Sequence, residues 1–586
     1  MRFTGKFPGG STMQRIFSEH LTRPVKSLDG IWRITAHDEN GTSVQAGVPG
    51  VWERIPALAG FRGTADYTRK VHTDHDANLL LRFGGVSHTA KVFWDGSMIG
   101  RHYNAFTGFS ILLPAVPGGE HELRVEVDDS YGPHSALHVP NDYMTYGGIN
   151  RPVEIHEVRQ AYIERMAFHS EEEEDGSFTA HVRVFVHAVD PLKEASLNVS
   201  IAGSSASGVV PDLPRGESAD VNLRLHIPHV RKWDLGQGNL YCLQARLIVN
   251  GDETDDLIDR VGFRTIRISG EDILLNGRKV RIKGFNRHED HGQFGCSLPV
   301  EAMMDDLQMI LDMGGNSVRT CHYPNDPRFL DLCDELGILV WEENHARALP
   351  EQVFHSELFA EQCAACNEEM IGQHVNHPSI YVWGLLNECE SDTEFGRKVY
   401  ATQIAQLREL DPTRPISYAS CRFFKDICLD LVDIASFNIY PGWYTDEKPA
   451  DLADRLFRWM DGNGAENKPI LITEIGAGAV SGFHDPLHHA KWSEERQCEI
   501  LREQLSDIHR IQRCSGTYIW QFADVRVAEE WAKNRPKCMN NKGVVDQFRV
   551  PKMAYATVRE IYSALGDTET GDGDRGRFPV SRPDRA

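Results

Sequence analysis

The feature that most constrains the fold is an alternation of short β-prone runs with helical stretches in the second half of the chain. Eight such runs follow residue 279: VRIKGF, NSVRTC, ILVWEE, SIYVWGLL, PISYAS, IASFNIY, ILITEIG and GTYIWQF. Intervening segments such as VEAMMDDLQMILDMGG repeat apolar residues at the helical spacing i, i+3, i+4. Since polar or Gly/Pro positions and a candidate helix follow each run, the pattern predicts a (β/α)8 TIM barrel over residues 266–566.

The first 265 residues show a different pattern, in which apolar and polar residues alternate between Gly, Pro and Asp turns. This predicts an antiparallel, jelly-roll-like β-sandwich over residues 1–158 and an immunoglobulin-like β-sandwich over residues 159–265. Asn276-Gly277 predicts a hairpin where the third domain opens. The polar, Gly/Pro-rich residues 567–586 are expected to form a disordered tail. We therefore expect a multidomain chain.

Charge and hydropathy limit the partners. A formal charge of -23 and a pI near 5.6 would repel phosphates, so we expect no nucleic acid and no anionic membrane surface as partner. The N-terminus has no continuous apolar segment, and no run approaches the roughly 18 apolar residues of a membrane span. We expect a cytoplasmic protein with a small-molecule partner. The twelve cysteines are interpreted as buried free thiols of a reducing compartment.

Two carboxylates close apolar runs. Glu388 ends the fourth run and Glu474 lies at the end of the seventh. In a (β/α)8 barrel the carboxyl ends of all strands share one face, where active sites lie. Two carboxylates at one substrate are what glycoside cleavage requires, and their separation decides between retention and inversion. Either residue taken alone is equally well explained as a solvated loop residue or an ion-pair partner.

Several segments resemble those of glycoside hydrolase family 2, over about residues 25–565. They are NHPSIYVWGLLNE, FNRHEDHGQFG, RTCHYPNDPRFLDLCDELGILVWEE and ILITEIGAGA. Within that family, FGGVSHTAKVFWDG, NIYPGWY, KWSEERQ, IWQFAD and MNNKG resemble segments of the β-glucuronidases. The order of sandwich, immunoglobulin-like domain and barrel is also that family's architecture.

The resemblance implies roles for individual residues. Glu388 matches the general acid/base and Glu474 the nucleophile of a retaining, double-displacement mechanism. Tyr440 matches a tyrosine that hydrogen-bonds the nucleophile and keeps it ionised. Asn387 would hold the sugar 2-hydroxyl, and Asp142 would reach the sugar pocket from the first domain. The remaining substrate-binding residues implied are His288, His322, Asn438, Tyr444 and Trp520.

The substrate prediction depends on Asn540 and Lys542. An Asn-x-Lys at this place resembles the motif with which β-glucuronidases grip the C6 carboxylate, since Lys supplies a charge and Asn a directed donor. Judged by composition alone, the same stretch is typical of a surface turn. The arginine that often precedes the motif is absent, so Arg535 or Lys537 is a candidate substitute.

The sequence predicts no metal and no cofactor. HEDH at residues 288–291 lacks a third ligand at a recognisable spacing, and there is no phosphate-binding glycine motif. The short segment ENHARALPEQVFHSELF suggests an open mouth, and Cys389 next to the acid/base suggests sensitivity to thiol reagents, or else an inert buried thiol. The family further implies a homo-oligomer.

The predicted function is that of a retaining exo-β-glucuronidase acting on glucuronide conjugates or uronic-acid-capped oligosaccharides. Two alternatives stay open: a β-galacturonidase or β-galactosidase of the same family, and a non-catalytic carbohydrate-binding protein. The intact pair of carboxylates speaks against the second alternative, because a binding protein has no need of both.

Overall fold

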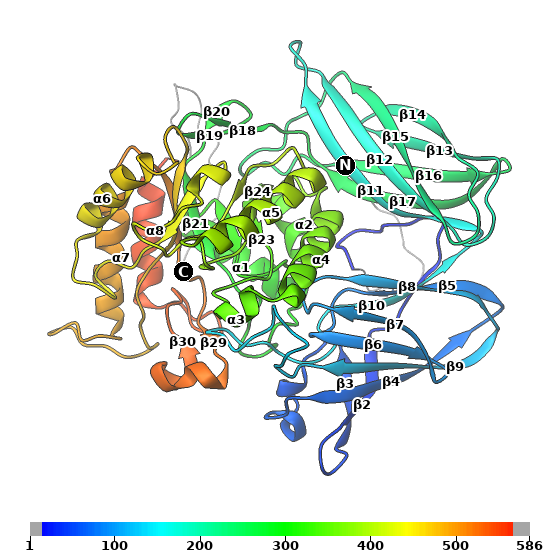
Figure 1. Cartoon of the computed structure of the whole chain (residues 1–586), viewed down its shortest axis with the longest axis horizontal. Coiled ribbons are helices and arrows are strands. Elements are labelled where there is room, and N and C mark those ends of the chain that lie inside the picture. The colour runs from blue at the N-terminus through cyan, green and yellow to red at the C-terminus, as the bar shows by residue number, and fades with distance from the viewer. Residues whose placement is uncertain (1–13, 567–586) are drawn as a thin grey trace, which may run out of the picture.

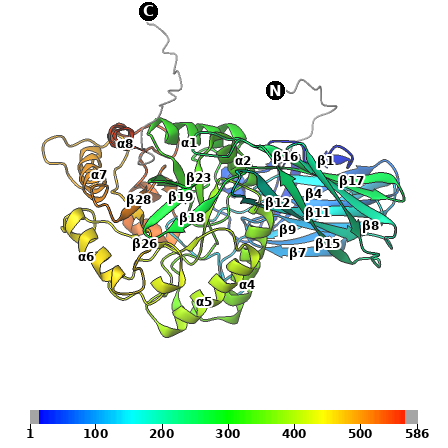
Figure 2. The same cartoon turned by 90° about the horizontal axis from the view of Figure 1, so that it is seen from above.

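The computed structural model describes residues 14–566 of the 586-residue chain. Two β-sandwiches lie together on one side of a barrel (Figures 1 and 2). Helices α2 (Pro327–Leu336) and α4 (Glu357–His374) are on the barrel side near the sandwiches, while α6 (Pro449–Asp461) and α7 (Glu494–Ile508) are on the far side. The predicted multidomain class is confirmed. The predicted tail, residues 567–586, lies outside the described residues.

The first sandwich packs a six-stranded antiparallel sheet against a four-stranded one. The alternation read from the sequence buries one side of each strand, with Trp32, Tyr67 and Val125 in the core between the sheets. In spatial order the larger sheet contains β3 (Ser43–Val48), β2 (Gly30–Ala36), β4 (Thr64–Thr73), β9 (Gly119–Asp128), β6 (Thr89–Trp94) and β7 (Ser97–Tyr103). The smaller sheet contains β1 (Val25–Ser27), β10 (Val153–Val158), β5 (Ala77–Phe83) and β8 (Phe109–Val116), and two short 3-10 turns, η1 (Trp52–Arg54) and η2 (Pro56–Leu58), precede β4.

The second sandwich has immunoglobulin-like proportions, with three strands facing four. Strand β12 alternates strictly between buried and less buried residues, as a half-buried strand should. The first sheet contains β11 (Ala161–Glu172), β12 (Phe178–Ala188) and β15 (Ser218–Ile227). The second contains β14 (Ser204–Val210), β13 (Ala195–Ile201), β16 (Tyr241–Val249) and β17 (Asp252–Val261).

The predicted hairpin at Asn276-Gly277 is confirmed. Both residues have positive φ, 52° and 76°, which is what a two-residue type I′ turn requires. The hairpin belongs to a small sheet of β18 (Ile266–Ser269), β19 (Asp272–Leu275) and β20 (Arg278–Lys279), and it leads directly into the barrel.

All eight predicted barrel strands are present, parallel and buried along their whole length. A parallel bridge between Ser420 and Phe437 joins the two end strands, so the sheet closes. The strands are β21 (Ile282–Asn286), β22 (Ser317–Thr320), β23 (Leu339–Glu343), β24 (Ile380–Gly384), β25 (Ile416–Ser417), β26 (Ala435–Asn438), β27 (Ile470–Ile475) and β28 (Cys514–Ile519). The outer helices also include α1 (Val300–Asp312), α3 (Glu351–Phe354), α5 (Glu394–Leu410) and α8 (Met553–Ala564).

Local sequence signals position these helices. Ser356, Thr393 and Ser493 cap α4, α5 and α7 by accepting a backbone N–H with the side-chain oxygen. Helix α2 starts with Asp326 as cap and Pro327 as its first residue, and it ends at Gly337 in the left-handed region, at φ 67°. These caps define where each of these helices begins or ends, and so where the chain returns to the next barrel strand.

One expected helix is absent. The fifth strand is followed only by the 3-10 turn η3 (Leu429–Leu431), so the prediction of a helix after every run was wrong there. Asp426 accepts hydrogen bonds from the hydroxyls of Ser391, Tyr418 and Ser420 and from the backbone N–H of Cys428. These side-chain bonds fix a turn in place of a helix.

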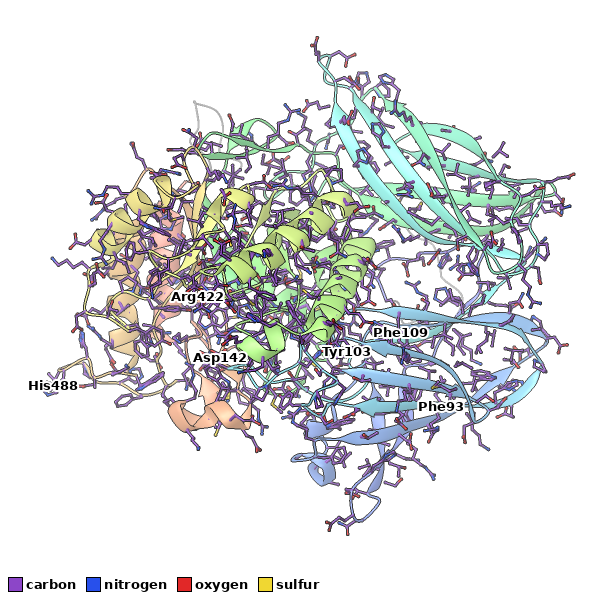
Figure 3. The ribbon with its side chains drawn as sticks, viewed as in Figure 1. Phe93, Tyr103, Phe109, Asp142, Arg422 and His488 are labelled. Carbon is purple, nitrogen blue, oxygen red and sulfur yellow. The ribbon has the colours of Figure 1, made fainter. Side chains whose placement is uncertain are left out.

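A buried ion pair and a buried hydrogen bond join the first sandwich to the barrel. Arg151 donates to Glu289 at 2.8 Å, and Tyr146 donates to Asp290 at 3.0 Å. The acidic residues of the HEDH segment therefore belong to the contact between these two domains. Asp142 lies at the barrel, whereas Phe93 lies out on the sandwich (Figure 3).

The cysteines are free thiols, and most of them are buried, as predicted. Cys242 and Cys538 are exposed and depart from that prediction. Cys363 and Cys366 form a Cys-x-x-Cys spacing on α4, where burial raises the pKa of both thiols. Among residues 14–566 no helix is long and apolar enough to cross a membrane.

Candidate active site

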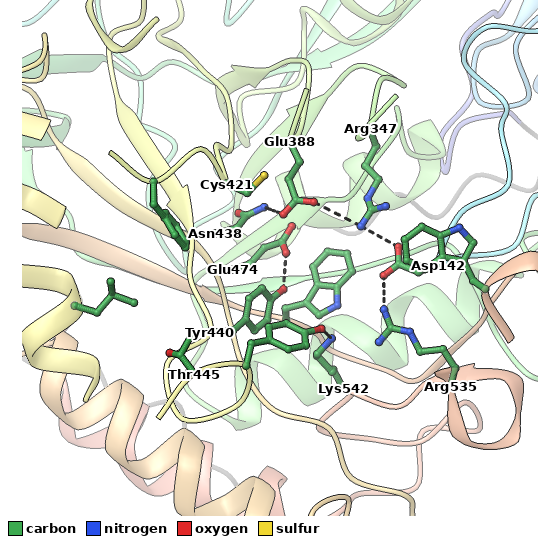
Figure 4. Close-up of a pocket in the computed structure, with 15 residues that line it drawn as sticks. Asp142, Arg347, Glu388, Cys421, Asn438, Tyr440, Thr445, Glu474, Arg535 and Lys542 are labelled. Atoms are coloured by element: carbon green, nitrogen blue, oxygen red, sulfur yellow. Dashed lines mark hydrogen bonds and ion pairs between the residues drawn. The ribbon is translucent and has the colours of Figure 1, made fainter. Parts of the chain in front are cut away.

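A cavity of about 320 Å³ opens at the carboxyl ends of the barrel strands (Figure 4). Barrel residues form most of its wall, and Asp142 enters it from the loop between β9 and β10 of the first sandwich. The lining residues are Asp142, Arg347, Glu388, Cys421, Phe423, Asn438, Tyr440, Tyr444, Thr445, Leu452, Glu474, Trp520, Trp531, Arg535 and Lys542.

Glu388 is held in a tight turn four residues beyond β24. Leu386 and Glu388 both have left-handed φ, 49° and 53°, a conformation that is uncommon for non-glycine residues. The backbone N–H of Glu388 donates to the carbonyl of Ala419 at 2.9 Å, which anchors the turn to the neighbouring strand segment. Asn438 donates to the Glu388 carboxylate at 3.0 Å, and Arg347 lies 3.7 Å from it. The carboxylate thus has a fixed orientation inside the cavity.

Glu474 lies on β27 and is almost fully buried. Tyr440 donates to its Oε2 at 2.5 Å, and Arg319 donates to its Oε1 at 3.1 Å. The hydrogen bond from Tyr440 is the one that the resemblance implied. Both carboxylate oxygens are therefore oriented by neighbours that belong to barrel strands or to the ends of strands.

The protonation of Glu474 differs from expectation. Burial and the nearby charge of Glu388 raise its pKa to about 7, although Arg319 and Tyr440 pull in the other direction. Tyr440 therefore does not keep Glu474 ionised throughout the acid range in the free protein.

Asp142 brings the first sandwich into the cavity. It forms ion pairs with Arg347 at 3.1 Å and with Arg535 at 3.0 Å, and these pairs continue from Glu388 through Arg347 (Figure 4). Burial alone would raise its pKa, but Arg347, Arg535 and Lys542 outweigh burial and lower it to about 2. Asp142 is therefore an anion at all ordinary pH values.

Lys542 is a buried cation on the opposite side of the cavity. Its Nζ donates to the Tyr444 hydroxyl at 2.7 Å and lies 5.3 Å from the ring centre of Tyr440. Burial lowers its pKa. A buried ammonium without a carboxylate at hydrogen-bond distance, among the residues that the structure describes, is positioned to receive an anion.

Eight of the twelve predicted site residues line the cavity, and four lie behind its wall: Asn387, Asn540, His288 and His322. Asn540 donates to Asp142 at 3.2 Å. His322 stacks on Trp520 with ring centres 5.1 Å apart, and His288 contacts Tyr323.

Burial keeps the pKa of both histidines, His288 and His322, well below its usual range. Asn387 accepts from Arg319 at 2.7 Å, and its Nδ2 has no hydrogen-bond partner within residues 14–566. Asn387 Nδ2 is therefore a buried donor without a partner in the described part of the chain, which is unusual for a buried polar group.

Six lining residues escaped the sequence prediction, and Arg535 was one of two candidates for an additional cation. Arg347 follows the third strand by four residues, so the strand-end rule applied to all eight strands would have found it. Lys537, the other candidate, is exposed and is not a lining residue. No spacing in the sequence marks the other five, which are Cys421, Phe423, Thr445, Leu452 and Trp531.

The two cysteines near Glu388 are both weakly acidic. Cys389 is buried, and burial raises its pKa to about 12. Cys421 lines the cavity, and burial followed by the charge of Glu388 raises its pKa to about 12. Since the thiolate is the reactive form, the inert interpretation of Cys389 fits the structure better than the reactive one.

Comparison with family models identifies both the barrel and the second sandwich. The model "Glycosyl hydrolases family 2, TIM barrel domain" matches residues 266–566. The model "Glycosyl hydrolases family 2" matches residues 161–264.

Among solved structures, the chain is similar to a β-galacturonidase of this family from Eisenbergiella tayi bound to galacturonate. Sequence identity is 47%, the TM-score is 0.92, and the match covers 95% of this chain and 100% of that one. A β-D-glucuronidase from Dictyoglomus thermophilum matches at 25% identity with a TM-score of 0.81, covering 96% and 99% of the two chains.

Among curated proteins, a β-glucuronidase of Streptococcus agalactiae is 27% identical over 533 residues, which cover 84% of this chain and 86% of that protein. The barrel and the second sandwich agree with these matches. The chain belongs to glycosyl hydrolase family 2 and is a glycoside hydrolase.

Proposed function

We propose that the protein is a retaining exo-β-uronidase that cleaves β-D-galacturonides in preference to β-D-glucuronides. The observation that carries the proposal is the position of a buried cation, Lys542, in the same cavity as the carboxylates Glu388 and Glu474. A cavity of about 320 Å³ suits one sugar and part of its aglycone better than a long chain.

In the proposed mechanism Glu474 is the nucleophile and Glu388 the general acid. Arg319 and Tyr440 orient the two oxygens of Glu474 toward a fixed attack direction. Glu388 protonates the departing oxygen and then removes a proton from water, which releases the sugar with its anomeric configuration retained. Asn387 supports the first step, because its unpartnered Nδ2 is available to donate to the sugar 2-hydroxyl.

The charge balance supports an anionic sugar. The cavity is lined by three carboxylates, Asp142, Glu388 and Glu474, and by three cations, Arg347, Arg535 and Lys542. Acid-assisted displacement requires one proton on the two carboxylates Glu388 and Glu474. With that proton the sum of these six groups is one positive charge, which the C6 carboxylate of a uronide would neutralise. A neutral sugar would leave that charge buried and uncompensated.

The comparison with Eisenbergiella tayi supports galacturonides as the first choice. That β-galacturonidase shares 47% identity with this chain, whereas the β-glucuronidases compared above share 25% and 27%. The order of the two sugars is thus the reverse of the one that the sequence motifs favoured. β-Glucuronides remain the second candidate, because the curated relative named above is a β-glucuronidase.

The direct test is a set of initial rates on p-nitrophenyl β-D-galacturonide, β-D-glucuronide and β-D-galactoside under identical conditions. We expect the highest kcat/KM on the galacturonide, a lower value on the glucuronide, and little turnover of the galactoside. Preference for the galactoside would overturn the anionic-sugar proposal. Binding of galacturonate without turnover of any substrate would favour the carbohydrate-binding alternative.

A further inference from the structure

The immunoglobulin-like domain carries a second cluster of chemically reactive side chains, far in the sequence from the barrel. His169 and Glu171 lie on β11, and His181 lies on β12. Residues two apart on a strand project from the same face, and His181 pairs directly with His169 across the ladder. The three side chains therefore share the outer face of a regular sheet, where β11 and β12 run side by side (Figure 1).

The distances within this histidine cluster (His169, Glu171 and His181) fit a common ligand. One ligand atom from each of the three side chains lies within 4.8 Å of the other two. His181 Nε2 and Glu171 Oε2 are 3.6 Å apart, which is too long for a hydrogen bond. Two ligands bound at about 2.0–2.1 Å in a tetrahedral zinc site are separated by about 3.3 Å, so a small closure brings them to coordination distance.

The histidines are also available as ligands. His181 Nε2 is buried and has no hydrogen-bond partner among residues 14–566. The His169 and His181 rings are parallel, with centres 4.4 Å apart, so the two imidazoles lie directly beside each other.

The charged residues and the ligand types around the histidine cluster determine which ions it favours. Arg224 is the cross-strand partner of His181 on β15 and opposes a cation, whereas Glu171 and the acidic run that follows it, Glu172 to Asp175, favour one. Two imidazoles with one carboxylate select first-row divalent ions such as Zn²⁺, Cu²⁺ or Ni²⁺ over Mg²⁺ or Ca²⁺, which prefer oxygen.

We propose that His169, Glu171 and His181 form a surface site for one Zn²⁺ or a similar transition-metal ion. The site would bridge β11 and β12 and leave at least one coordination position open to water. It borders a polar cavity of about 400 Å³ between this domain and barrel residues such as Thr413 and Arg414. A bound ion would therefore stabilise the hairpin at the junction of the two domains without touching the glycoside site.

The test is calorimetric titration of metal-free, tag-free protein with ZnCl2. The wild type should bind one equivalent, and His169→Ala and His181→Ala should each weaken binding by at least about 10-fold, because loss of a ligand costs no less than loss of a supporting contact. Glu171 is exposed, so Glu171→Gln tests the third ligand with little risk to folding. His187→Ala is the matched control, since His187 lies on the same strand but bonds to Ser218.

The outcomes separate the site from the other histidines of the chain. Absence of saturable Zn²⁺ binding to the wild type would overturn the proposal, as would binding that survives both histidine substitutions. Visible absorption of the Co²⁺-loaded wild type should report low coordination number and vanish in His181→Ala. Circular dichroism and the rate of glycoside hydrolysis should be unchanged in all four variants, which rules out misfolding as the cause.

Discussion

The two sides of the cavity are built in different ways. Glu388, Glu474 and Tyr440 lie on barrel strands or at most four residues beyond them, and their oxygens are fixed by hydrogen bonds from neighbouring strands. The other, loop-borne side contains Asp142, Arg535 and Lys542 from loops away from the barrel strand ends, one of them from another domain. Arg347, four residues beyond β23, belongs to this side because it forms an ion pair with Asp142. The strand-borne side carries the groups to which we assign the bond-breaking chemistry, and the loop-borne side carries charges that suit recognition. This assignment predicts that chemistry and recognition are separable by mutation.

The largest effect is expected on the strand-borne side. Glu474→Gln keeps the shape and removes the nucleophile, so kcat should fall by about 10⁴-fold or more on every substrate. Glu301→Gln, an exposed change on α1, is the control and should leave kcat unaltered. Circular dichroism checks folding. Residual activity above a few per cent in well-folded Glu474→Gln would show that both sides of the cavity had been assigned wrongly.

The next effect should be confined to the loop-borne side. Lys542→Met keeps the length of the side chain and removes the charge, which should cost a uronide about 2–5 kcal/mol in kcat/KM by loss of one partner of a buried charge pair. The galactoside rate should change little. Equal losses of kcat/KM on the uronide and the galactoside would mean that Lys542 supports the chemistry and does not bind the C6 carboxylate.

Arg535 and Lys537 form a matched pair that sharpens the comparison. Arg535→Ala removes the ion pair to Asp142 and should lower kcat/KM for uronides by about 10-fold, since hydrogen bonds to charged groups are worth about 1.5–3 kcal/mol. Lys537→Ala should change it by less than about 0.5 kcal/mol, because the side chain is exposed and outside the cavity wall. Steady-state kinetics of the two variants measure both effects. A larger loss of kcat/KM in Lys537→Ala than in Arg535→Ala would show that Arg535 is not part of the cationic side of the cavity.

The smallest effect is the dependence on pH. Burial and Glu388 raise the pKa of Glu474 to about 7, so the nucleophile takes up a proton below that value. The kcat/KM of the wild type should fall by about tenfold between pH 8 and pH 6, since the ionised nucleophile is lost. Because Asp142 has a pKa of about 2, it stays ionised over this range and does not contribute to the decline. A flat kcat/KM between pH 8 and pH 6 would contradict the raised pKa of Glu474.

The two sides also differ in how far the sequence predicts them. Strand ends are readable, because an apolar run that stops at Glu388 or Glu474 identifies both the element and the face. Asp142 and Lys542 required the family resemblance, since their loops carry ordinary turn residues. Arg347 was missed because the strand-end rule was not applied to the third strand, whereas Phe423 was missed because a loop's path depends on tertiary packing, which has no period in the sequence. The turn after the fifth strand has a tertiary cause too, since Asp426 binds the hydroxyls of Ser391 and Tyr418.

The central claim is that Glu474 attacks a uronyl group held in this cavity. The most direct test is mass spectrometry of the protein after reaction with a 2-deoxy-2-fluoro-β-D-galacturonide that carries a reactive leaving group. The account predicts a covalent uronyl adduct on the peptide that contains Glu474. An adduct on Glu388, or release of the α-anomer from the ordinary substrate with no adduct, would contradict it.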